Sequence, residues 1–254
     1  MEKFEKEIIF VTTTLYTKWL DYQREIIKKL FPDSEHLIVD GRSNWPNSWF
    51  YWIEEVKNTD YKYFVHIDED FFITSKEEFI KCIEKMESEN LDLLGVPDGL
   101  HHYRGANPIA INTFLMFGRV DKLKNIDLTN IRFHFTQKGW SNNLNLSFKE
   151  EYKSEWCYNF LKVGEPNFDY EQEPYYAFMW SMKEIGSKFE YLFPRFDDYF
   201  KSTNPRIDEE SNDIGIHMWY TRQWNSNMDV WGLPNNERYN RIENKLKDDR
   251  FCNS

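Results

Sequence analysis

The first hundred residues alternate between short apolar runs and longer segments with helical spacing. Apolar or β-branched runs predict strands, and apolar residues recurring at i, i+3 and i+4 predict amphipathic helices. The predicted strands cover residues 7–13, 36–40, 61–67 and 91–96, and the predicted helices cover residues 19–30, 49–56 and 75–88. Pro32 ends the first helix, and Ser75 with Glu78 forms a capping pattern before the third. This alternation predicts a parallel sheet with right-handed crossovers, the Rossmann-like half of an α/β fold.

The rest of the chain follows a less regular pattern. Residues 108–117 predict a strand, and the polar and aromatic residues 125–167 predict loops and short antiparallel strands. Pro174 and Gly186 bracket an expected helix. Further strands are predicted at 189–193 and 214–219, and a charged, helical tail at 235–250. We expect one domain over residues 1–254, with a first half at about 1–100, a second half at about 101–234 and a tail at 235–254.

The composition is that of a globular domain with an acidic surface. The 254 residues, 41% hydrophobic and 18% aromatic, are enough to bury a substantial core. A formal net charge of −11 argues against nucleic acid as a partner, because phosphate backbones are held by clustered Lys and Arg. One small anion held through a metal remains possible, since it needs only local positive charge.

Cysteine usage and hydropathy bear on the compartment. Cys82, Cys157 and Cys252 lie far apart without metal-binding spacing, which indicates free thiols in a reducing environment. No apolar run approaches the ~20 residues that span a bilayer, and the start of the chain has no signal-peptide pattern. We therefore expect a cytoplasmic protein without a transmembrane segment. Peripheral membrane contact through residues 138–156 is left open, because aromatic clusters also form cores and sugar-binding surfaces.

Asp68 and Asp70 come directly after the predicted strand at residues 61–67. In open α/β sheets, ligands lie outside the carboxyl ends of the strands. Two carboxylates spaced i, i+2 at that place suit Mg²⁺ or Mn²⁺, which take part of their shell from carboxylates and the rest from water and substrate phosphates. The alternative is that the acids only form a polar exit from the strand.

His217, at the end of a predicted strand, and Arg222, in the segment after it, could complete such a site. A histidine beside apolar residues most often has a structural role. With Asp68 and Asp70, however, His217 forms a set of two carboxylates and one imidazole that Mn²⁺ accepts well. Arg222 adds a fixed positive charge, which together with a metal would stabilise charge developing on a phosphate leaving group.

Polar residues elsewhere are weaker candidates. A group of three acids and one amide lies at the predicted helix start. A carboxylate of this group could act as general base towards a hydroxyl or hold a sugar hydroxyl, although acids there also complement the helix dipole. Its members are Asp169, Glu171, Gln172 and Glu173. At the ends of the first two strands, Thr12, Thr13 and Asp40, with Arg42 in the following loop, could frame a ligand pocket or only cap local backbone.

Two further candidates lie after residue 97. Asn112 interrupts an apolar strand, and a buried amide must be paired with backbone or with ligand. Arg104 lies in the preceding loop, where a substrate would approach. His101 and His102 do not suit a zinc site, because adjacent histidines cannot easily converge on one ion.

The order of these features resembles that of the nucleotide-sugar glycosyltransferases of the GT-A fold. The resemblance runs from Ile8 to about Trp224 and rests on four motifs. These are Asp68-Glu69-Asp70 in the position of the DxD motif, the strand Asn112-Thr-Phe-Leu-Met-Phe117, the acidic element Glu171-Gln172-Glu173, and the late histidine His217. Asn112-Thr113 lacks the small Ser-Gly pair of that family, which affects the expected contact with the donor sugar.

This resemblance implies a three-layer α/β/α sandwich whose central sheet is mostly parallel, with a small antiparallel part on the acceptor side. The first half would bind the nucleotide and the second half the sugar and acceptor. Asp70 and His217 would ligate Mn²⁺ or Mg²⁺, Asp68 would hold ribose or metal, and Asp40 would contact the base. Arg222 would lie near the diphosphate, and whether transfer retains or inverts the anomeric configuration stays open.

The leading hypothesis is a metal-dependent glycosyltransferase that moves a sugar from a nucleotide-sugar, UDP-sugar being favoured, to a hydroxyl of a saccharide or glycolipid acceptor. A metal-dependent phosphoesterase or nucleotidyltransferase would also use Asp68 and Asp70. Such enzymes need a further carboxylate pair or a Gly- and Lys-rich phosphate loop, and the sequence has neither. The third hypothesis is a catalytically silent carbohydrate-binding protein whose aromatic residues hold sugar and whose acids hold Ca²⁺.

Overall fold

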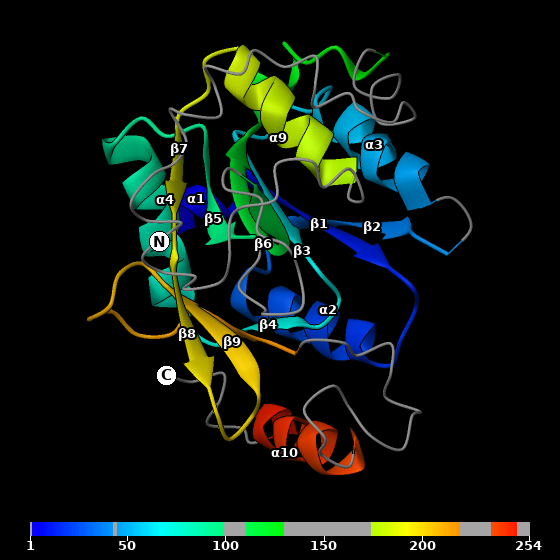
Figure 1. Ribbon diagram of the computed structural model, residues 1–254, viewed down its shortest axis with the longest axis vertical. Coiled ribbons are helices and arrows are strands. Elements are labelled where there is room, and N and C mark those ends of the chain that lie inside the picture. Colours follow the sequence, from blue (N-terminus) through cyan, green and yellow to red (C-terminus); the bar gives the residue numbers. More distant parts are fainter. Residues whose placement is uncertain (1, 43–44, 99–109, 130–173, 219–234, 248–254) are drawn as a thin grey trace, which may run out of the picture.

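A six-stranded sheet forms the centre of the fold (Figure 1). The computed structural model describes residues 2–42, 45–98, 110–129, 174–218 and 235–247. The strand order is β2-β1-β3-β6-β5-β7, and only β6 runs antiparallel to its neighbours. The strands are β1 (Ile8–Thr14), β2 (Glu35–Asp40), β3 (Tyr63–Ile67), β5 (Leu93–Pro97), β6 (Ile111–Arg119) and β7 (Phe189–Tyr191).

A second, smaller sheet is antiparallel and has the order β4-β10-β9-β8. Its strands are β4 (Phe71–Ile73), β8 (Phe193–Asp197), β9 (Ser202–Arg206) and β10 (Gly215–His217). β4 follows β3 after a short turn, so the chain passes from the large sheet to the small one at the Asp68-Glu69-Asp70 motif. The α/β fold with a mostly parallel central sheet and a small antiparallel sheet is therefore confirmed.

Helices cover both faces of the central sheet. The described helices are α1 (Glu2–Glu5), α2 (Trp19–Leu30), α3 (Trp45–Val56), α4 (Lys76–Ser88), α5 (Val120–Leu123), α9 (Pro174–Glu184) and α10 (Asn235–Lys247). Ile8 and Phe10 of β1 pack in one core with α2 and α4, whereas Ile9 and Val11 pack in a second core with α3 and α9. Because side chains alternate along a strand, a strand covered on both faces is an unbroken apolar run, which is the pattern of residues 8–11.

Most of the predicted elements are present, within a few residues at their ends. The capping pattern is confirmed, since the backbone N–H of Glu78 donates to Ser75 Oγ at 3.2 Å at the start of α4. A cap of this kind contributes about 1 kcal/mol. Pro174 is the first residue of α9, and Gly186, with φ of 80°, follows its end. None of the helices in the described ranges combines the length and the apolar character needed to cross a bilayer.

The small sheet is where prediction and structure differ. Residues 189–193 were expected to form one strand, but β7 ends at Tyr191 in the large sheet and β8 begins at Phe193 in the small one. β4 and β9 were not predicted. β9 has the sequence Ser-Thr-Asn-Pro-Arg, which carries no apolar alternation, and its pairing with β8 and β10 is what makes it a strand.

Candidate functional site

The carboxyl ends of the parallel strands meet at one edge of the central sheet. Asp40 ends β2, Asp68 follows β3, and Asp98 follows β5. Because β6 runs in the opposite direction, its first residues lie at the same edge, with Ile111 opposite Pro97. The predicted polar side chains at strand ends are thus gathered at the place where open α/β sheets bind their ligands.

Asp68, Asp70 and His217 converge at this edge. One ligand atom from each residue lies within 4.8 Å of the others, and His217 Nε2 is 3.3 Å from Asp70 Oδ1. Asp70 and His217 are buried, and Asp68 is half-buried. Within the ranges that the structure describes, these are the residues whose acidic or imidazole groups meet in a metal-binding arrangement. Two carboxylates and one imidazole form a donor set that can hold a divalent cation.

Pairing between β4 and β10 brings His217 to the carboxylates. His217 lies opposite Phe71, the residue after Asp70, and the backbone N–H of Met218 donates to the carbonyl oxygen of Asp70 at 2.9 Å. The imidazole stacks on the ring of Phe114, with centroids 4.0 Å apart and planes 10° apart. Backbone pairing and ring stacking together fix the position and the plane of the imidazole.

Gly215 lets β10 approach β4 closely. A Cβ atom at this position would lie 2.3 Å from Cζ of Phe71 and 2.6 Å from the carbonyl oxygen of Phe72. Both separations are far below van der Waals contact, and one of them involves backbone. A side chain at position 215 would therefore push β10, and His217 with it, away from the carboxylates.

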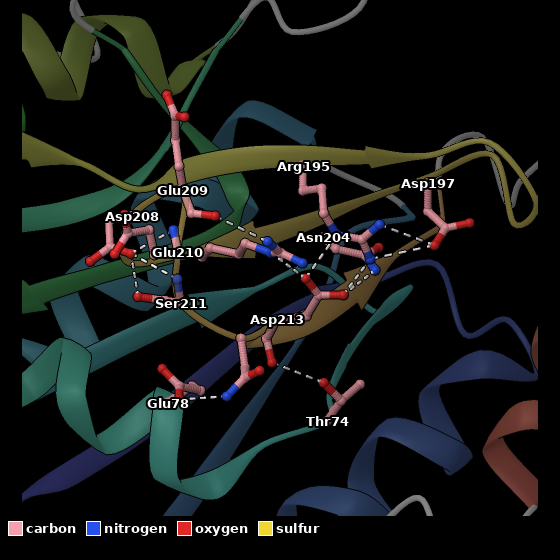
Figure 2. A network of polar contacts seen from close by, with 12 residues as sticks. Thr74, Glu78, Arg195, Asp197, Asn204, Asp208, Glu209, Glu210, Ser211 and Asp213 are labelled. Carbon is pink, nitrogen blue, oxygen red and sulfur yellow. Dashed lines mark hydrogen bonds and ion pairs between the residues drawn. The ribbon is translucent and has the colours of Figure 1, made fainter.

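A polar network anchors the chain just before β10 (Figure 2). Asp213 accepts hydrogen bonds from Nε of Arg195 at 2.9 Å, Nε of Arg206 at 2.6 Å and Nδ2 of Asn204 at 2.8 Å. Burial raises the pKa of Asp213, but these hydrogen bonds outweigh it and hold the pKa below its usual range. The Thr74 hydroxyl donates to the Asp213 carbonyl oxygen at 3.3 Å, which ties the segment to the end of β4. The network thus fixes the start of the strand that carries His217.

The turn around Asp68 is held by hydrogen bonds from three elements. Thr113 Oγ1 of β6 donates to Asp68 Oδ2 at 3.4 Å, and the backbone N–H of Phe71 donates to the Asp68 carbonyl oxygen at 3.0 Å. Gln23 of α2 also donates to that carbonyl oxygen. These bonds fix the backbone of the motif at the Asp68 carbonyl oxygen and contact the Asp68 carboxylate at Oδ2.

Asp40, Arg42 and Tyr16 form a second group along the edge. Nε of Arg42 is 3.0 Å from Oδ1 of Asp40, and its guanidinium carbon is 4.3 Å from the ring centroid of Tyr16. Hydrogen bonds from Arg42 lower the pKa of Asp40. Tyr16 is 49% exposed, so the group presents a ring and a guanidinium plane to solvent. Arg42 was a candidate from the sequence, whereas Tyr16 was not.

Thr12 is buried and Thr13 is half-buried at the end of β1. Thr12 is fully buried, and its hydroxyl donates to Oε1 of Gln23 at 2.8 Å and lies 2.9 Å from Nε2 of His36. Thr13 Oγ1 lies 3.4 Å from Nε2 of His66. Burial lowers the pKa of both histidines to about 4. These contacts support the end of β1 from within the protein.

Asn112 is paired within the protein. Its Nδ2 donates to Asp98 Oδ1 at 2.9 Å, and its Oδ1 accepts from the backbone N–H of Phe114 at 3.2 Å. Asp98 is fully buried and also accepts from the hydroxyls of Tyr175, at 3.1 Å, and Tyr176. The amide of Asn112 is therefore paired with backbone through its oxygen and with a carboxylate through its nitrogen, beneath the start of α9.

Six candidates lie outside the described residues. These are Arg104, Asp169, Glu171, Gln172, Glu173 and Arg222. Glu69, Asp98 and Asp213, in contrast, are acids near the site that the sequence did not single out. Each follows or precedes a strand, which was the available signal, but their partners come from distant segments.

Comparison with known proteins gives likenesses to solved structures. No family model and no curated protein matches the sequence. Among solved structures, the chain is similar to a glycosyltransferase involved in the glycosylation of the major capsid of PBCV-1, with 14% identity over 85% of this chain and 96% of that one and a TM-score of 0.46. It is also similar to a protein from STIV, with 16% identity over 58% of this chain and 78% of that one and a TM-score of 0.40.

Proposed function

We propose that this protein is a metal-dependent glycosyltransferase that transfers a sugar from a nucleotide-sugar donor to a hydroxyl of a saccharide or glycolipid acceptor. UDP-sugar is the favoured donor. The observation that carries the proposal is the convergence of Asp68, Asp70 and His217 at the carboxyl edge of a mostly parallel sheet. A divalent cation held by these three side chains would supply positive charge to the phosphates of a ligand lying across the strand ends.

The residues fit a divalent cation of the Mn²⁺ or Mg²⁺ type. Carboxylate oxygens suit both ions, and the imidazole nitrogen favours Mn²⁺. Asp68, Asp70 and His217 would hold the ion, which when bound would offset the negative charge that develops on a diphosphate leaving group. The protein's own contribution is to fix these three side chains before the ligand arrives, through β-pairing and the Asp213 network.

The nucleoside would lie beside the Asp40, Arg42 and Tyr16 group. The exposed ring and the guanidinium suit a planar base, and the Asp40 carboxylate can accept hydrogen bonds from a base or ribose. Thr13 would border this pocket and Asn112 the donor sugar. Arg104 and Arg222 would add positive charge near the diphosphate. The group at Asp169, Glu171, Gln172 and Glu173 would supply the general base or hold a sugar hydroxyl.

The direct test is thermal unfolding of the wild type and of Asp70→Asn with a panel of UDP-, GDP-, CMP- and dTDP-sugars, with and without Mn²⁺. One donor class should raise the melting temperature of the wild type in a Mn²⁺-dependent manner. Saturation at one hundred times the dissociation constant adds about 2.7 kcal/mol to the free energy of unfolding. Asp70→Asn should lose this rise, and Asp208→Asn, which removes an exposed carboxylate from the loop before β10, should keep it.

The competing functions predict other results. Binding of free sugars without any nucleotide effect would identify a carbohydrate-binding protein. Mn²⁺-dependent cleavage of the nucleotide, detected by mass spectrometry, without transfer of the sugar to any acceptor glycan would identify a phosphoesterase. Transfer of the sugar to an acceptor hydroxyl, lost in Asp70→Asn, is the result that supports the glycosyltransferase.

A further inference from the structure

Glu69, between the two metal-site aspartates, is bonded to the loop that follows β1. Its side chain accepts hydrogen bonds from the hydroxyl of Thr14, from the backbone N–H of Thr17 at 3.2 Å and from that of Leu15 at 3.4 Å. The residue is 6% exposed. A buried carboxylate with several donors resists displacement, because each bond to a charged group is stronger than one between neutral groups.

The loop that Glu69 holds carries Tyr16 in an unusual conformation. Tyr16 has φ of 58°, in the left-handed region, which costs a residue with a side chain about 1 kcal/mol. Its backbone N–H donates to Thr14 Oγ1 at 2.7 Å, and Thr14 Oγ1 in turn donates to Glu69. Without Glu69, the Thr14 hydroxyl and the Thr17 N–H lose the acceptor whose hydrogen bonds offset the energetic cost of the left-handed Tyr16 backbone.

The same loop determines where the Tyr16 ring lies against Arg42. Arg42 is held independently by Asp40, through Nε and through its backbone N–H at 2.9 Å. The ring is 49% exposed, and in the described part of the chain its cation–π contact is with the Arg42 guanidinium, 4.3 Å from the ring centroid. The position of the ring therefore depends on the loop backbone, and through it on Glu69.

We infer that Glu69 is a positioning residue that holds Tyr16 in place to receive a nucleobase, so that one turn of the chain sets both the metal ligands and the base-binding face. This inference rests on the proposed function. Asp68 and Asp70 flank Glu69, and the turn that contains all three is fixed at the Asp68 carbonyl oxygen by Phe71 and Gln23. The distance between metal and base positions is then built into the Asp-Glu-Asp sequence.

The test is a mutant cycle between Glu69 and Tyr16, read by binding of UDP and GDP without metal and at saturating Mn²⁺. Loss of a stacking ring weakens base binding about tenfold, so Tyr16→Ala and Glu69→Ala should each weaken the preferred nucleotide by about that factor. The double variant should bind no more weakly than Tyr16→Ala alone. Affinity for Mn²⁺ alone should change less than about threefold in Glu69→Ala and at least about tenfold in Asp70→Asn.

Three controls keep the test sharp. Glu25→Ala removes an exposed carboxylate of α2 and should bind like the wild type. Glu69→Gln keeps one side-chain oxygen for the Thr17 N–H and should recover most of the affinity. Thr14→Val breaks the same contact from the other side, and should behave like Glu69→Ala if that variant fails to fold.

Each outcome has one meaning. Additive losses in the double variant, or unchanged nucleotide binding in both Glu69→Ala and Thr14→Val, overturn the role of Glu69 and leave the proposed function standing. The proposed function, and the inference with it, are overturned if the wild type binds neither UDP nor GDP under any condition and no nucleotide-sugar raises its melting temperature.

Discussion

At the scale of single residues, the carboxylate of Asp98 is a buried group that depends on several hydrogen-bond donors. It is fully buried and accepts from Asn112, Tyr175 and Tyr176. Asp98→Asn would set an amide N–H₂ against some of these donors, so we expect a loss of about 2 to 3 kcal/mol in the free energy of unfolding by urea. Asp208→Asn, at an exposed position, should lose less than about 0.5 kcal/mol. Equal stability of the two variants would contradict a structural role for Asp98.

The buried imidazole of His66 should make stability depend on pH. Burial lowers its pKa from 6.5 to about 4, although the carbonyl of Thr113, 2.8 Å from Nδ1, opposes the shift. The unfolded chain therefore binds a proton that the folded chain does not, and stability should fall as pH drops from 6.5 to 4, by up to about 3 kcal/mol. Urea unfolding at pH 7.5, 6, 5 and 4 measures this.

A variant without the imidazole provides the control for that titration. His66→Gln should show a pH dependence smaller by about one proton, while His36, whose pKa burial also lowers to about 4, contributes in both proteins. If the free energy of unfolding changes with pH in the same way for the wild type and for His66→Gln between pH 4 and 6.5, then burial does not lower the pKa of His66, and the expectation fails.

Sequence reasoning found the residues whose signal is local. Asp68 and Asp70 end an apolar run, and a carboxylate at a strand end is visible without knowing what lies beside it. Glu69 belongs to the same run of acids, yet its partners Thr14 and Thr17 come from the end of β1 and the loop before α2, more than fifty residues earlier in the chain. Such a role depends on which loop packs against the turn, and a single sequence does not specify that.

At the scale of elements, the placement of β10 depends on Asp213. Removing its charge in Asp213→Asn weakens its bonds with Arg195 and Arg206, which should lower stability by about 2 kcal/mol. Because β10 carries His217, the affinity for Mn²⁺, measured by titration calorimetry, should also fall by about tenfold. Asp208→Asn is the matched control, since Asp208 lies in the same loop and its hydrogen bonds within the described residues are to its neighbours Glu210 and Ser211. Unchanged Mn²⁺ affinity in Asp213→Asn would separate the network from the metal site.

The elements that were predicted and those that were missed differ in how they are stabilised. The strand at residues 8–14 begins with an unbroken apolar run and the helix at 76–88 has apolar residues at helical spacing, so the existence of both follows from the sequence. β4 has three residues and is a strand because β10 pairs with it. β9 contains a proline and is a strand because β8 and β10 pair with it. Prediction therefore gave the central sheet with its helices, the acids at its edge and a small antiparallel part, but not β4 and β9 or the pairing of β4 with β10 that brings His217 to the acids.

At the scale of the whole molecule, the site joins segments from both halves of the chain. The Asp68-Glu69-Asp70 turn belongs to the first half, and β10 adds His217 from far along the sequence. β10 pairs with β4, which directly follows that turn. The described part of the second half thus reaches the candidate metal site through the small sheet, so changes that loosen this sheet should affect binding of Mn²⁺ before they affect the central sheet.

The helix α10 packs against α2, and Glu243 of α10 forms hydrogen bonds across this contact. Glu243 accepts hydrogen bonds from Lys18 Nζ at 2.8 Å, Lys247 Nζ at 2.7 Å and the Tyr22 hydroxyl at 2.9 Å. These bonds, that of Lys18 above all, lower the pKa of Glu243 from 4.5 to about 2. Nearby, the rings of Trp19 and Tyr239 are 5.8 Å apart in the apolar part of the same interface.

Because the folded protein holds Glu243 ionised, its contribution is present above pH 4.5 and is lost as pH falls towards 2. We expect Glu243→Gln to be about 1 kcal/mol less stable than the wild type at pH 7, and this difference to shrink steadily below pH 4.5. Glu237→Gln removes an exposed carboxylate of the same helix that pairs with Arg241, one turn away, and should cost less than about 0.5 kcal/mol at any pH. Urea unfolding of the three proteins at pH 7, 4 and 3 measures the differences. A difference between Glu243→Gln and the wild type that stays constant over this range would mean that the charge of Glu243 does not contribute to stability.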